Sequence, residues 1–436
     1  MRTLRRLGLV LFLTVAAFSG GLVATQAALA RDPAGPYGKL DVFSHVLSLI
    51  ENNYVESIDE GRLVYGAVRG MLGTLDPHTT FMDPHEYLAM KQETDGEYGG
   101  IGIEIDANKN GGFVVISPMD DSPASRAGIL PGDRIIKVDG TLTSTWKKDE
   151  AATKLKGPPG TKVTLSIMRD GFSEPRDFVL IRDNVRVVSV DHRVLDVGRH
   201  YGYVRIKSFQ DRTDVYLKKA LDEMRLEVGG ELQGLVLDLR RNPGGLLDQA
   251  VKVADRFLTD GVIVTTKGRG GRHVEVETAH EKDTEPNYPM LVLVDGGSAS
   301  ASEIVAGALQ DRGRAVLMGT QTFGKGSVQT IIELEDGSGL KLTVARYFTP
   351  SGRSIQEKGI TPDVIVAAGQ GIASIGENGG VRESSLPNHF KNNAGPQAAN
   401  DAPWYQPDYQ LKTAADYMRS WQIIKSTAVP KTAEAK

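Results

Sequence analysis

The chain has 436 residues, which is enough for two or three domains, and its formal net charge of -4 gives no electrostatic reason to expect a nucleic-acid partner. It contains no cysteine, which excludes disulfides, cysteine-ligated zinc and a thiol nucleophile. No group of His, Asp and Glu residues has metal-ligand spacing, so we expect neither a metal nor another cofactor.

The first 30 residues have the pattern of a secretory signal peptide. Three arginines precede an apolar run over residues 7–18, and Ala28-Leu29-Ala30 is a small-residue cleavage site. Residues 22–24 extend the apolar stretch, so the alternative is an uncleaved anchor in the inner membrane. In both cases the rest of the chain is expected to be periplasmic or otherwise extracytoplasmic. No later segment approaches the roughly 20 apolar residues that span a bilayer.

Residues 31–94 are predicted to form an N-terminal helical region. Apolar residues recur there at spacings of 3 and 4 and mark one face of a helix: Leu40, Phe43, Leu47, Ile50 and Tyr54. We expect this face to pack on its own domain. The alternative is that it pairs two subunits of a homo-oligomer. The segment 75–80 contains Asp76-Pro77 and predicts a turn that ends the preceding helix.

Residues 95–183 change to short strands separated by Gly and Pro, with clear strands over 163–168 and 178–181. The segment from Ser122 to Gly140 resembles the signature of PDZ domains. Upstream, a glycine-rich stretch looks like the carboxylate-binding loop of that family and comprises Tyr98, Gly99, Gly100, Ile101, Gly102 and Ile103. Glycines let successive N–H groups point into one concavity that can hold a terminal carboxylate. Alternatively, these glycines only permit tight turns. A PDZ domain binds and does not cut, so the chain is either a scaffold or an enzyme with a substrate-capture unit.

Residues 184–368 alternate strands and helices, which predicts an α/β domain with a largely parallel sheet. The expected strands are 203–206, 235–239, 262–266, 290–294 and 315–318. The expected helices are 213–228, 246–258 and one that starts near 300. A hairpin with Asp336-Gly337 at its turn is expected over 331–348. Residues 369–402 are rich in Gly, Asn, Ser and Ala and are predicted to be a flexible linker.

Residues 403–436 are predicted to form a C-terminal helical segment and tail. The helix is expected over 408–424, and its docking residues are expected to be Tyr409, Leu411, Ala415 and Trp421.

Three segments of the α/β region combine glycines with polar residues: 238–245, 294–304 and 319–329. In the second, serines follow a strand at the start of a helix. There a hydroxyl points outward beside free N–H donors, which can hold the oxyanion of an acyl-transfer intermediate. Spacing alone does not rank the three serines of this segment: Ser298, Ser300 and Ser302. Ser300-Ala301-Ser302-Glu303 is also a capping box, in which Ser300 would only cap the helix.

Together with the PDZ signature, these segments occur in the order found in the carboxyl-terminal processing proteases, also called tail-specific proteases. The chain resembles that family over about residues 40–366 and again around 408–424. The resemblance implies a crotonase-like (ClpP/crotonase-type) catalytic core with an inserted PDZ domain. It implies that Ser300 is the nucleophile, Lys325 the general base and Gln329 the residue that orients the lysine. The oxyanion hole would be formed by the backbone N–H of Ala301 and of a glycine in the pair Gly244-Gly245.

The chemistry of these residue types agrees with the resemblance. A lysine acts as a base only when neutral, so its pKa must lie well below the usual value, which burial achieves. The glycines beside Lys325 allow close backbone packing that excludes water. Gln329 is a neutral amide, which can position an amine without the negative charge that would keep it protonated. One departure from the family is Arg241, where many relatives carry Asn, which puts a charge beside the proposed oxyanion loop.

We therefore expect a serine endopeptidase that captures the C-terminal tails of periplasmic proteins, with a lipoprotein adaptor permitted by the resemblance. Three alternatives stay open. Gly319 to Lys325 nearly matches a phosphate-binding P-loop, but Gly326 replaces the required Ser or Thr, and a strand is expected where that motif has a helix. A Ser-His-Asp protease needs a histidine base, and none of the eight histidines has a recognised catalytic setting. A non-catalytic PDZ scaffold would bind tails without turnover.

Overall fold

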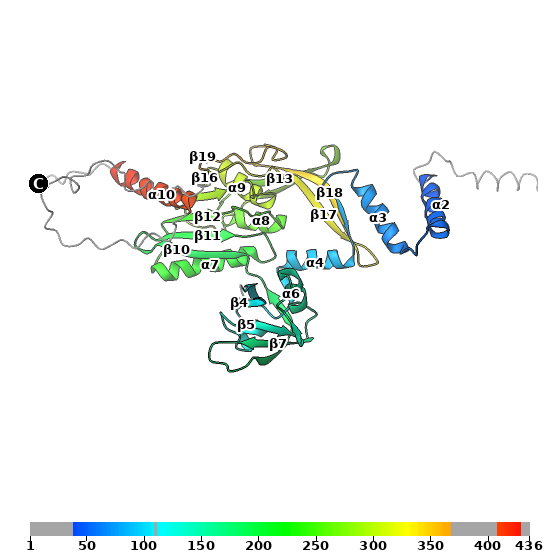
Figure 1. Cartoon of the computed structure of the whole chain (residues 1–436). Helices are drawn as coiled ribbons and strands as arrows, with labels where there is room; N and C mark the ends of the chain where they lie inside the picture. Colours follow the sequence, from blue (N-terminus) through cyan, green and yellow to red (C-terminus); the bar gives the residue numbers. More distant parts are fainter. Residues whose placement is uncertain (1–37, 109–110, 368–407, 429–436) are drawn as a thin grey trace, which may run out of the picture. The chain divides into compact units, whose positions relative to one another are not determined.

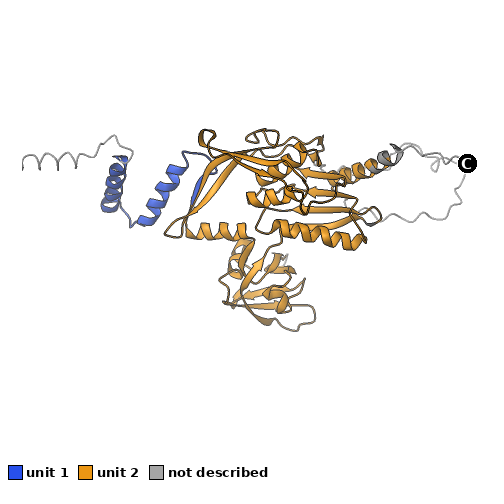
Figure 2. Cartoon of the chain, turned by 180° about the vertical axis from the view of Figure 1, so that it is seen from behind, with its two compact units in different colours: residues 1–81 blue, residues 82–436 orange. Residues whose placement is uncertain are grey.

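The structure is a computed structural model that describes residues 38–108, 111–367 and 408–428 (Figure 1). The predicted signal segment at 1–30 and the predicted linker at 369–402 lie outside these residues. The chain divides into two compact units, residues 1–81 and 82–436 (Figure 2). Within the described ranges, no helix combines the length and the apolar character needed to cross a membrane.

The described part of the first unit, residues 38–81, contains two helices, α2 (Gly38–Asn53) and α3 (Glu60–Leu72). The predicted turn after them is present, because the Asp76 carboxylate accepts hydrogen bonds from the N–H groups of residues 78 and 79. The expectation that the apolar face of α2 packs on its own domain is wrong. The helix has no buried residue, and Leu40 and Phe43 are 54% and 41% exposed. A periodic pattern identifies an apolar face and not what covers it.

The second unit begins with α4 (Pro84–Asp95), which starts at an Asp83–Glu86 capping box and ends at the left-handed Gly96. The PDZ-like part that follows is a sheet in the order β3-β4-β5-β7-β8, with β6 on β5 and two helices, and β2 pairs separately with β9. The bounds are β2 (Glu97–Gly100), β3 (Ile103–Ala107), β4 (Phe113–Pro118), α5 (Pro123–Arg126), β5 (Arg134–Val138), β6 (Thr141–Leu142), α6 (Lys148–Leu155), β7 (Lys162–Met168), β8 (Arg176–Ile181) and β9 (Asp183–Arg186).

The α/β part is built on a six-stranded sheet in the order β10-β11-β12-β15-β16-β19. Every pair from β11 to β19 is parallel, which confirms the predicted parallel sheet, and only β10 is antiparallel. The strands are β10 (Val190–Asp196), β11 (Tyr201–Ile206), β12 (Gly234–Asp238), β15 (Met290–Val294), β16 (Val316–Gly319) and β19 (Val364–Ile365). The helices are α7 (Thr213–Val228), α8 (Leu247–Asp255) and α9 (Ala301–Asp311).

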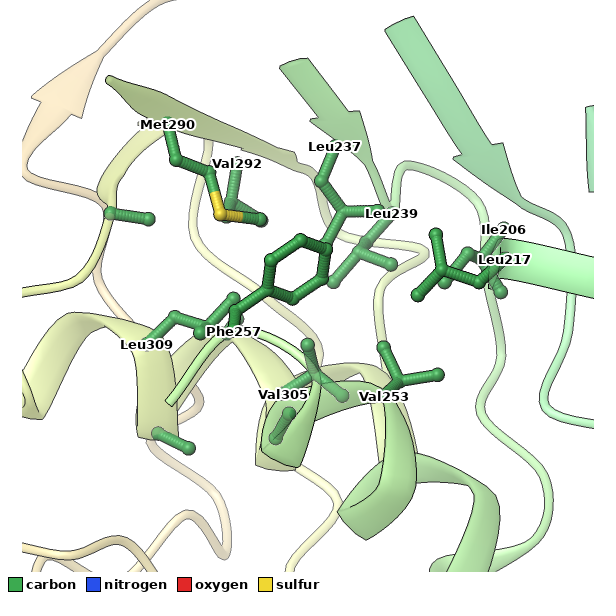
Figure 3. Close-up of a cluster of buried hydrophobic side chains, with 14 of the residues drawn as sticks. Ile206, Leu217, Leu237, Leu239, Val253, Phe257, Met290, Val292, Val305 and Leu309 are labelled. Carbon is green, nitrogen blue, oxygen red and sulfur yellow. The ribbon is translucent and has the colours of Figure 1, made fainter. Parts of the chain in front are cut away.

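Alternate side chains of each central strand point to opposite faces of this sheet, so both faces are apolar and both are covered. On one face, the strands pack against α7, α8 and α9. There Phe257 lies among Leu237 of β12, Leu239 just after that strand, and Val305 and Leu309 of α9 (Figure 3). This packing fixes the carboxyl ends of β12 and β15, and the loops that leave those ends carry two of the three motif segments.

A second sheet contains the predicted hairpin. It consists of β13 (Val262–Gly268), β14 (Glu275–Thr278), β17 (Ser327–Glu333) and β18 (Gly339–Phe348), with β18 between β17 and β13. The short strand β1 (Thr80–Met82) spans the boundary of the two units. Because β17 is a strand directly after Lys325, the segment 319–325 lacks the helix that a P-loop requires.

The other face of the six-stranded sheet is covered by the C-terminal helix α10 (Tyr409–Ala428). Leu411 and Ala415 are buried there as expected. Tyr409 and Trp421 are 49% and 56% exposed, so the expectation that they dock is wrong. A tyrosine or tryptophan in an amphipathic pattern indicates only the approximate side of a helix, and these two fall outside the stripe that meets the sheet.

A charged contact joins the start of α10 to the end of β12. The Arg240 guanidinium binds Asp238 and also reaches Asp408 at 2.7 and 2.9 Å and Gln410 at 3.0 Å. Asp238 is 1% exposed and also accepts the phenol proton of Tyr203. The hydrogen bonds from Arg240 lower the pKa of Asp408 although burial opposes the change, so this aspartate stays ionised. Residues that precede and follow the segment 368–407 thus share one ion cluster.

Candidate active site

A cavity of about 400 Å³ opens beside the N-terminus of α9. Its walls come from α4, from the loops after β11 and β12, from the start of α9 and from the hairpin β17–β18. All six residues predicted for catalysis and for the oxyanion hole line this one cavity: Ser300, Lys325, Gln329, Gly244, Gly245 and Ala301. No histidine of the described residues lines it, which disfavours a Ser-His-Asp site.

The structure separates the three serines that spacing could not rank. Ser298 and Ser302 are fully buried and donate their hydroxyl protons to the carbonyls of Leu239 at 2.8 Å and Asn242 at 2.9 Å. Ser300 alone of the three lines the cavity. Its backbone has a φ of 58° and a ψ of -116°, a conformation that non-glycine residues rarely adopt and that carries strain. Strain of this kind at a cavity wall is typical of a functional residue.

Glu303 connects Ser300 to Lys325. Its carboxylate is fully buried, and one oxygen accepts the backbone N–H of Ser300 at 2.8 Å and that of Lys325 at 2.9 Å. The other oxygen accepts the Thr322 hydroxyl at 2.6 Å and the Gly324 N–H at 2.7 Å. Burial raises the pKa of Glu303, and these four hydrogen bonds oppose the rise. The capping-box pattern foresaw the bond to Ser300 but not the bonds to the segment 322–325.

Lys325 is partly buried in the cavity wall. Burial lowers its pKa, the positive charge of Lys341 lowers it further, and the negative charge of Glu303 opposes both. Lys341 lies on β18 and lines the same cavity, as does the exposed Glu93 of α4. The depressed pKa is the direction that a general base requires. Within the described residues, no hydrogen bond joins the Lys325 amine to the Ser300 hydroxyl.

Gln329 lies on β17, and its amide interacts with hydroxyl groups of β17 and of the neighbouring strand β18. The side-chain N–H group donates to the Ser327 hydroxyl at 2.7 Å and reaches that of Thr343 at 3.5 Å. The structure therefore brings Gln329 to the same cavity as Lys325, but no hydrogen bond joins their side chains within the described residues. The orienting role stays a prediction.

The loop after β12 offers one free donor of the predicted glycine pair. The Gly244 N–H donates to the Asn242 side chain at 2.9 Å, so it is already used. Among the described residues, the N–H groups of Gly245 and Ala301 have no acceptor, as expected at the first turn of α9 for Ala301. A Cβ on Gly244 would lie 2.8 Å from Cβ of Ser300, so only glycine allows this approach. Gly245 and Ala301 are thus the candidate oxyanion donors.

The oxyanion loop is held by contacts that the sequence did not reveal. Asn242 is fully buried and donates to the Ile206 carbonyl at 2.9 Å while it accepts from Gly244. Arg241 has a φ of 56°, and its N–H donates to the Asp295 carboxylate at 2.8 Å. Asn is favoured over Arg in this left-handed conformation, so Arg241 is an unfavourable residue for the backbone at this position.

The predicted carboxylate-binding loop lies between β2 and β3 in the PDZ-like part. Strand β3 is the first in its sheet, so one backbone edge is open beside this loop. Within the described residues, the N–H groups of Ile101 and Gly102 have no acceptor. Gly102 has a φ of 71°, and a Cβ there would lie 2.3 Å from Cβ of Ser122. The Lys156 ammonium lies 4.8 Å from the Tyr98 ring centre at the same loop.

The described residues contain no group of three or more His, Cys, Asp or Glu that could hold a metal ion. A serine on a strained turn, two unoccupied N–H donors and a lysine of lowered pKa share one cavity. This arrangement is that of a serine-type peptidase, to which a PDZ-like unit is joined.

Comparison with known proteins identifies the family. Residues 200–366 match the model of peptidase family S41, residues 90–168 that of the PDZ domain, and residues 23–86 that of the N-terminal domain of the activating protease CtpB. The chain is 41% identical over 404 residues to the carboxy-terminal-processing protease of Bartonella bacilliformis, across 91% of this chain and 92% of that protein. It is 40% identical over 306 residues to the carboxyl-terminal-processing protease of Synechocystis sp., across 69% and 70%.

Among solved structures, the photosystem II D1 C-terminal processing protease shares 33% identity over 77% of this chain and 88% of that one, with a TM-score of 0.44. The chain belongs to the carboxy-terminal processing proteases of peptidase family S41 and is a serine-type peptidase.

Glu303→Gln is expected to lower both stability and activity. Either orientation of the new amide turns its NH₂ group toward two N–H or O–H donors, which leaves buried donors unpaired at a cost of about 1–3 kcal/mol each. Thermal unfolding should show the lost stability, and peptidase assays should show at least about a tenfold loss of kcat, the equivalent of about 1.4 kcal/mol. The exposed Glu227→Gln on α7 is the matched control. Full activity in Glu303→Gln would contradict this role.

Lys341→Gln is expected to move the acid limb of the pH–rate profile to higher pH. Activity rises as the Lys325 amine loses its proton, so it falls as pH drops through the lowered pKa of Lys325. Removing the charge of Lys341 raises that pKa, whereas Lys341→Arg retains the charge and should leave the limb in place. The measurement is kcat/KM against pH for the three proteins. Identical profiles would show that Lys341 does not tune the base.

Proposed function

We propose that this protein is an extracytoplasmic endopeptidase that cuts proteins with a Ser300–Lys325 dyad after its PDZ domain has bound their C-terminal tails. The single observation that supports it best is the convergence of Ser300, Lys325 and two unoccupied N–H donors on one cavity. We also propose that the core has the crotonase-type fold, which the family resemblance implies.

In the proposed mechanism, the Ser300 oxygen attacks the carbonyl carbon of the scissile peptide while the neutral Lys325 amine takes the hydroxyl proton. The N–H groups of Gly245 and Ala301 hold the oxyanion of the tetrahedral intermediate. Lys325 then gives its proton to the leaving amine, and the C–N bond breaks to leave an acyl-enzyme. Water, deprotonated by the same lysine, hydrolyses the ester and returns Ser300.

In this mechanism the Lys325 amine must form a hydrogen bond with the Ser300 hydroxyl. The described residues show no such bond, so the two side chains must move closer together. The Lys325 side chain has rotatable bonds and lies in the wall of the cavity that the substrate enters. Rotation of the Gln329 amide away from Ser327 would let its oxygen accept from the lysine and fix the amine. We infer that substrate binding and these rotamer changes complete the dyad.

The PDZ part supplies the tail-binding half of the proposal. An extended peptide can add to the open edge of β3, and its terminal carboxylate can meet the free N–H groups of Ile101 and Gly102. The predicted substrate-binding residues stay those of the whole loop: Tyr98, Gly99, Gly100, Ile101, Gly102 and Ile103.

The signal-like pattern of residues 1–30 supports a proposed site of action in the periplasm or another extracytoplasmic compartment. If the segment stays uncleaved, it would anchor the protein in the inner membrane. The exposed apolar face of α2 supports the proposal of a homo-oligomer through the N-terminal helix. A lipoprotein adaptor is the proposed further partner.

The proposal is tested by incubating the purified full chain with an envelope extract and identifying new C-termini by mass spectrometry. The wild type is expected to create them, and Ser300→Ala and Lys325→Ala are expected to lose at least about 1,000-fold in rate. A chain that binds tails equally well with and without Ser300 and creates no new C-termini in either form would instead be a scaffold.

Tail recognition predicts a difference between two forms of one peptide substrate. A peptide with a free C-terminal carboxylate should be cut with a lower KM than the same peptide with an amidated end, because the amide lacks the charge that the loop of residues 98–103 would hold. The measurement is KM and kcat for both forms. Equal KM values would refute tail recognition while leaving the Ser–Lys chemistry in place.

A further inference from the structure

The cavity wall contains a buried tyrosine, Tyr347, to which the proposed mechanism assigns no role. Tyr347 lies on β18, is 2% exposed and lines the cavity with Ser300 and Lys325. The sequence gives no signal for it, because a tyrosine in a β-hairpin is most often a packing residue.

Tyr347 holds the main chain of the proposed base at two points. Its phenol donates a hydrogen bond to the Lys325 carbonyl, and its own N–H donates to the Gly326 carbonyl at 3.0 Å. On the opposite side, a Cβ at Gly326 would lie 2.6 Å from the Gln356 nitrogen, so the chain is closely packed there as well. The backbone of residues 325 and 326 is therefore fixed between β18 and the segment that contains Gln356.

The same phenol interacts with the proposed nucleophile. Burial raises the pKa of Tyr347, and a hydrogen bond with the Ser300 side chain opposes the rise in part. A phenol of raised pKa keeps its proton at working pH and cannot serve as the base. Because the phenol gives its one proton to the Lys325 carbonyl, its oxygen can act toward the Ser300 hydroxyl only as an acceptor, and the hydroxyl must turn from it to Lys325 before the attack. The phenol therefore lies between the hydroxyl of one dyad member and the backbone of the other.

We propose that Tyr347 is a positioning residue of the Ser300–Lys325 dyad, whose phenol holds the Lys325 backbone in place and directs the Ser300 hydroxyl within the cavity. This inference rests on the proposed function. Tyr347 and Glu303 share the task of holding these residues, and they bind different groups of them. Glu303 fixes the two N–H groups, and Tyr347 fixes the Lys325 carbonyl and the Ser300 hydroxyl.

Tyr347→Phe tests the proposal, because it keeps the ring and removes only the hydroxyl. We expect kcat to fall at least about tenfold with KM within about twofold, since the hydroxyl acts on the reacting groups and not on substrate binding. The rate at which a fluorophosphonate labels Ser300 should fall in parallel. The substrate is fluorescently labelled casein, an unstructured protein.

Tyr201→Phe is the matched control. Tyr201 is also 2% exposed, and its phenol also donates to a backbone carbonyl, that of Met418 at 3.2 Å, in the contact between β11 and α10. Both variants should lose comparable stability in thermal unfolding, but only Tyr347→Phe should lose kcat and labelling rate. Equal kcat losses in the two variants, or unchanged kcat in Tyr347→Phe, would overturn the proposal.

The wild type and Ser300→Ala separate this result from a failure of the proposed function. An inactive wild type, or an active Ser300→Ala, would refute the Ser–Lys mechanism itself. An active wild type, an inactive Ser300→Ala and a fully active Tyr347→Phe would refute only the positioning role.

Discussion

The fully buried Glu303 carboxylate is the contact on which the candidate site depends, because one of its oxygens binds the backbone N–H groups of both Ser300 and Lys325. These residues come from different elements, the start of α9 and the loop before β17, and nothing else described here joins their main chains so directly. An ionised carboxylate in such a place is costly unless its oxygens are satisfied, and four donors satisfy them. The negative charge also opposes the lowering of the pKa of Lys325, an effect that burial and Lys341 outweigh.

Much of the α/β part could be predicted from the sequence because its signals are local. The buried strands over 235–239 and 290–294 and the helix over 213–228 are continuous or periodic apolar runs, and they are found within a residue of their predicted bounds. The edge strand β14 was missed because its four residues include a single valine, which is too short a pattern to identify a strand. The exposure of α2 could not be predicted either. Its apolar residues clearly mark one face of a helix, but the sequence does not show that this face has no buried residue in the structure.

The candidate site was predictable where the chemistry lies in short motifs and not where it depends on contacts between distant strands. Ser300, Lys325 and the glycine loop meet at one cavity as the order of their motifs indicated. The choice of Gly245 over Gly244 required the bond from Gly244 to Asn242, which is invisible in the sequence. Lys341 and Tyr347 could not be found at all, since their proximity to Lys325 comes from the pairing of β17 with β18.

The ion cluster of Arg240 joins two parts of the chain that are synthesised at different times. Arg240 stands just before the oxyanion loop, and its acceptors Asp408 and Gln410 come 168 and 170 positions later in the chain. A polypeptide emerges from its N-terminal end, so the loop is synthesised long before α10 exists. Until that helix arrives, a half-sequestered guanidinium lacks two of its acceptors, and the loop is left with fewer restraints. The restraint that α10 adds to the loop after β12 is therefore available only once residues 408–410 have been synthesised.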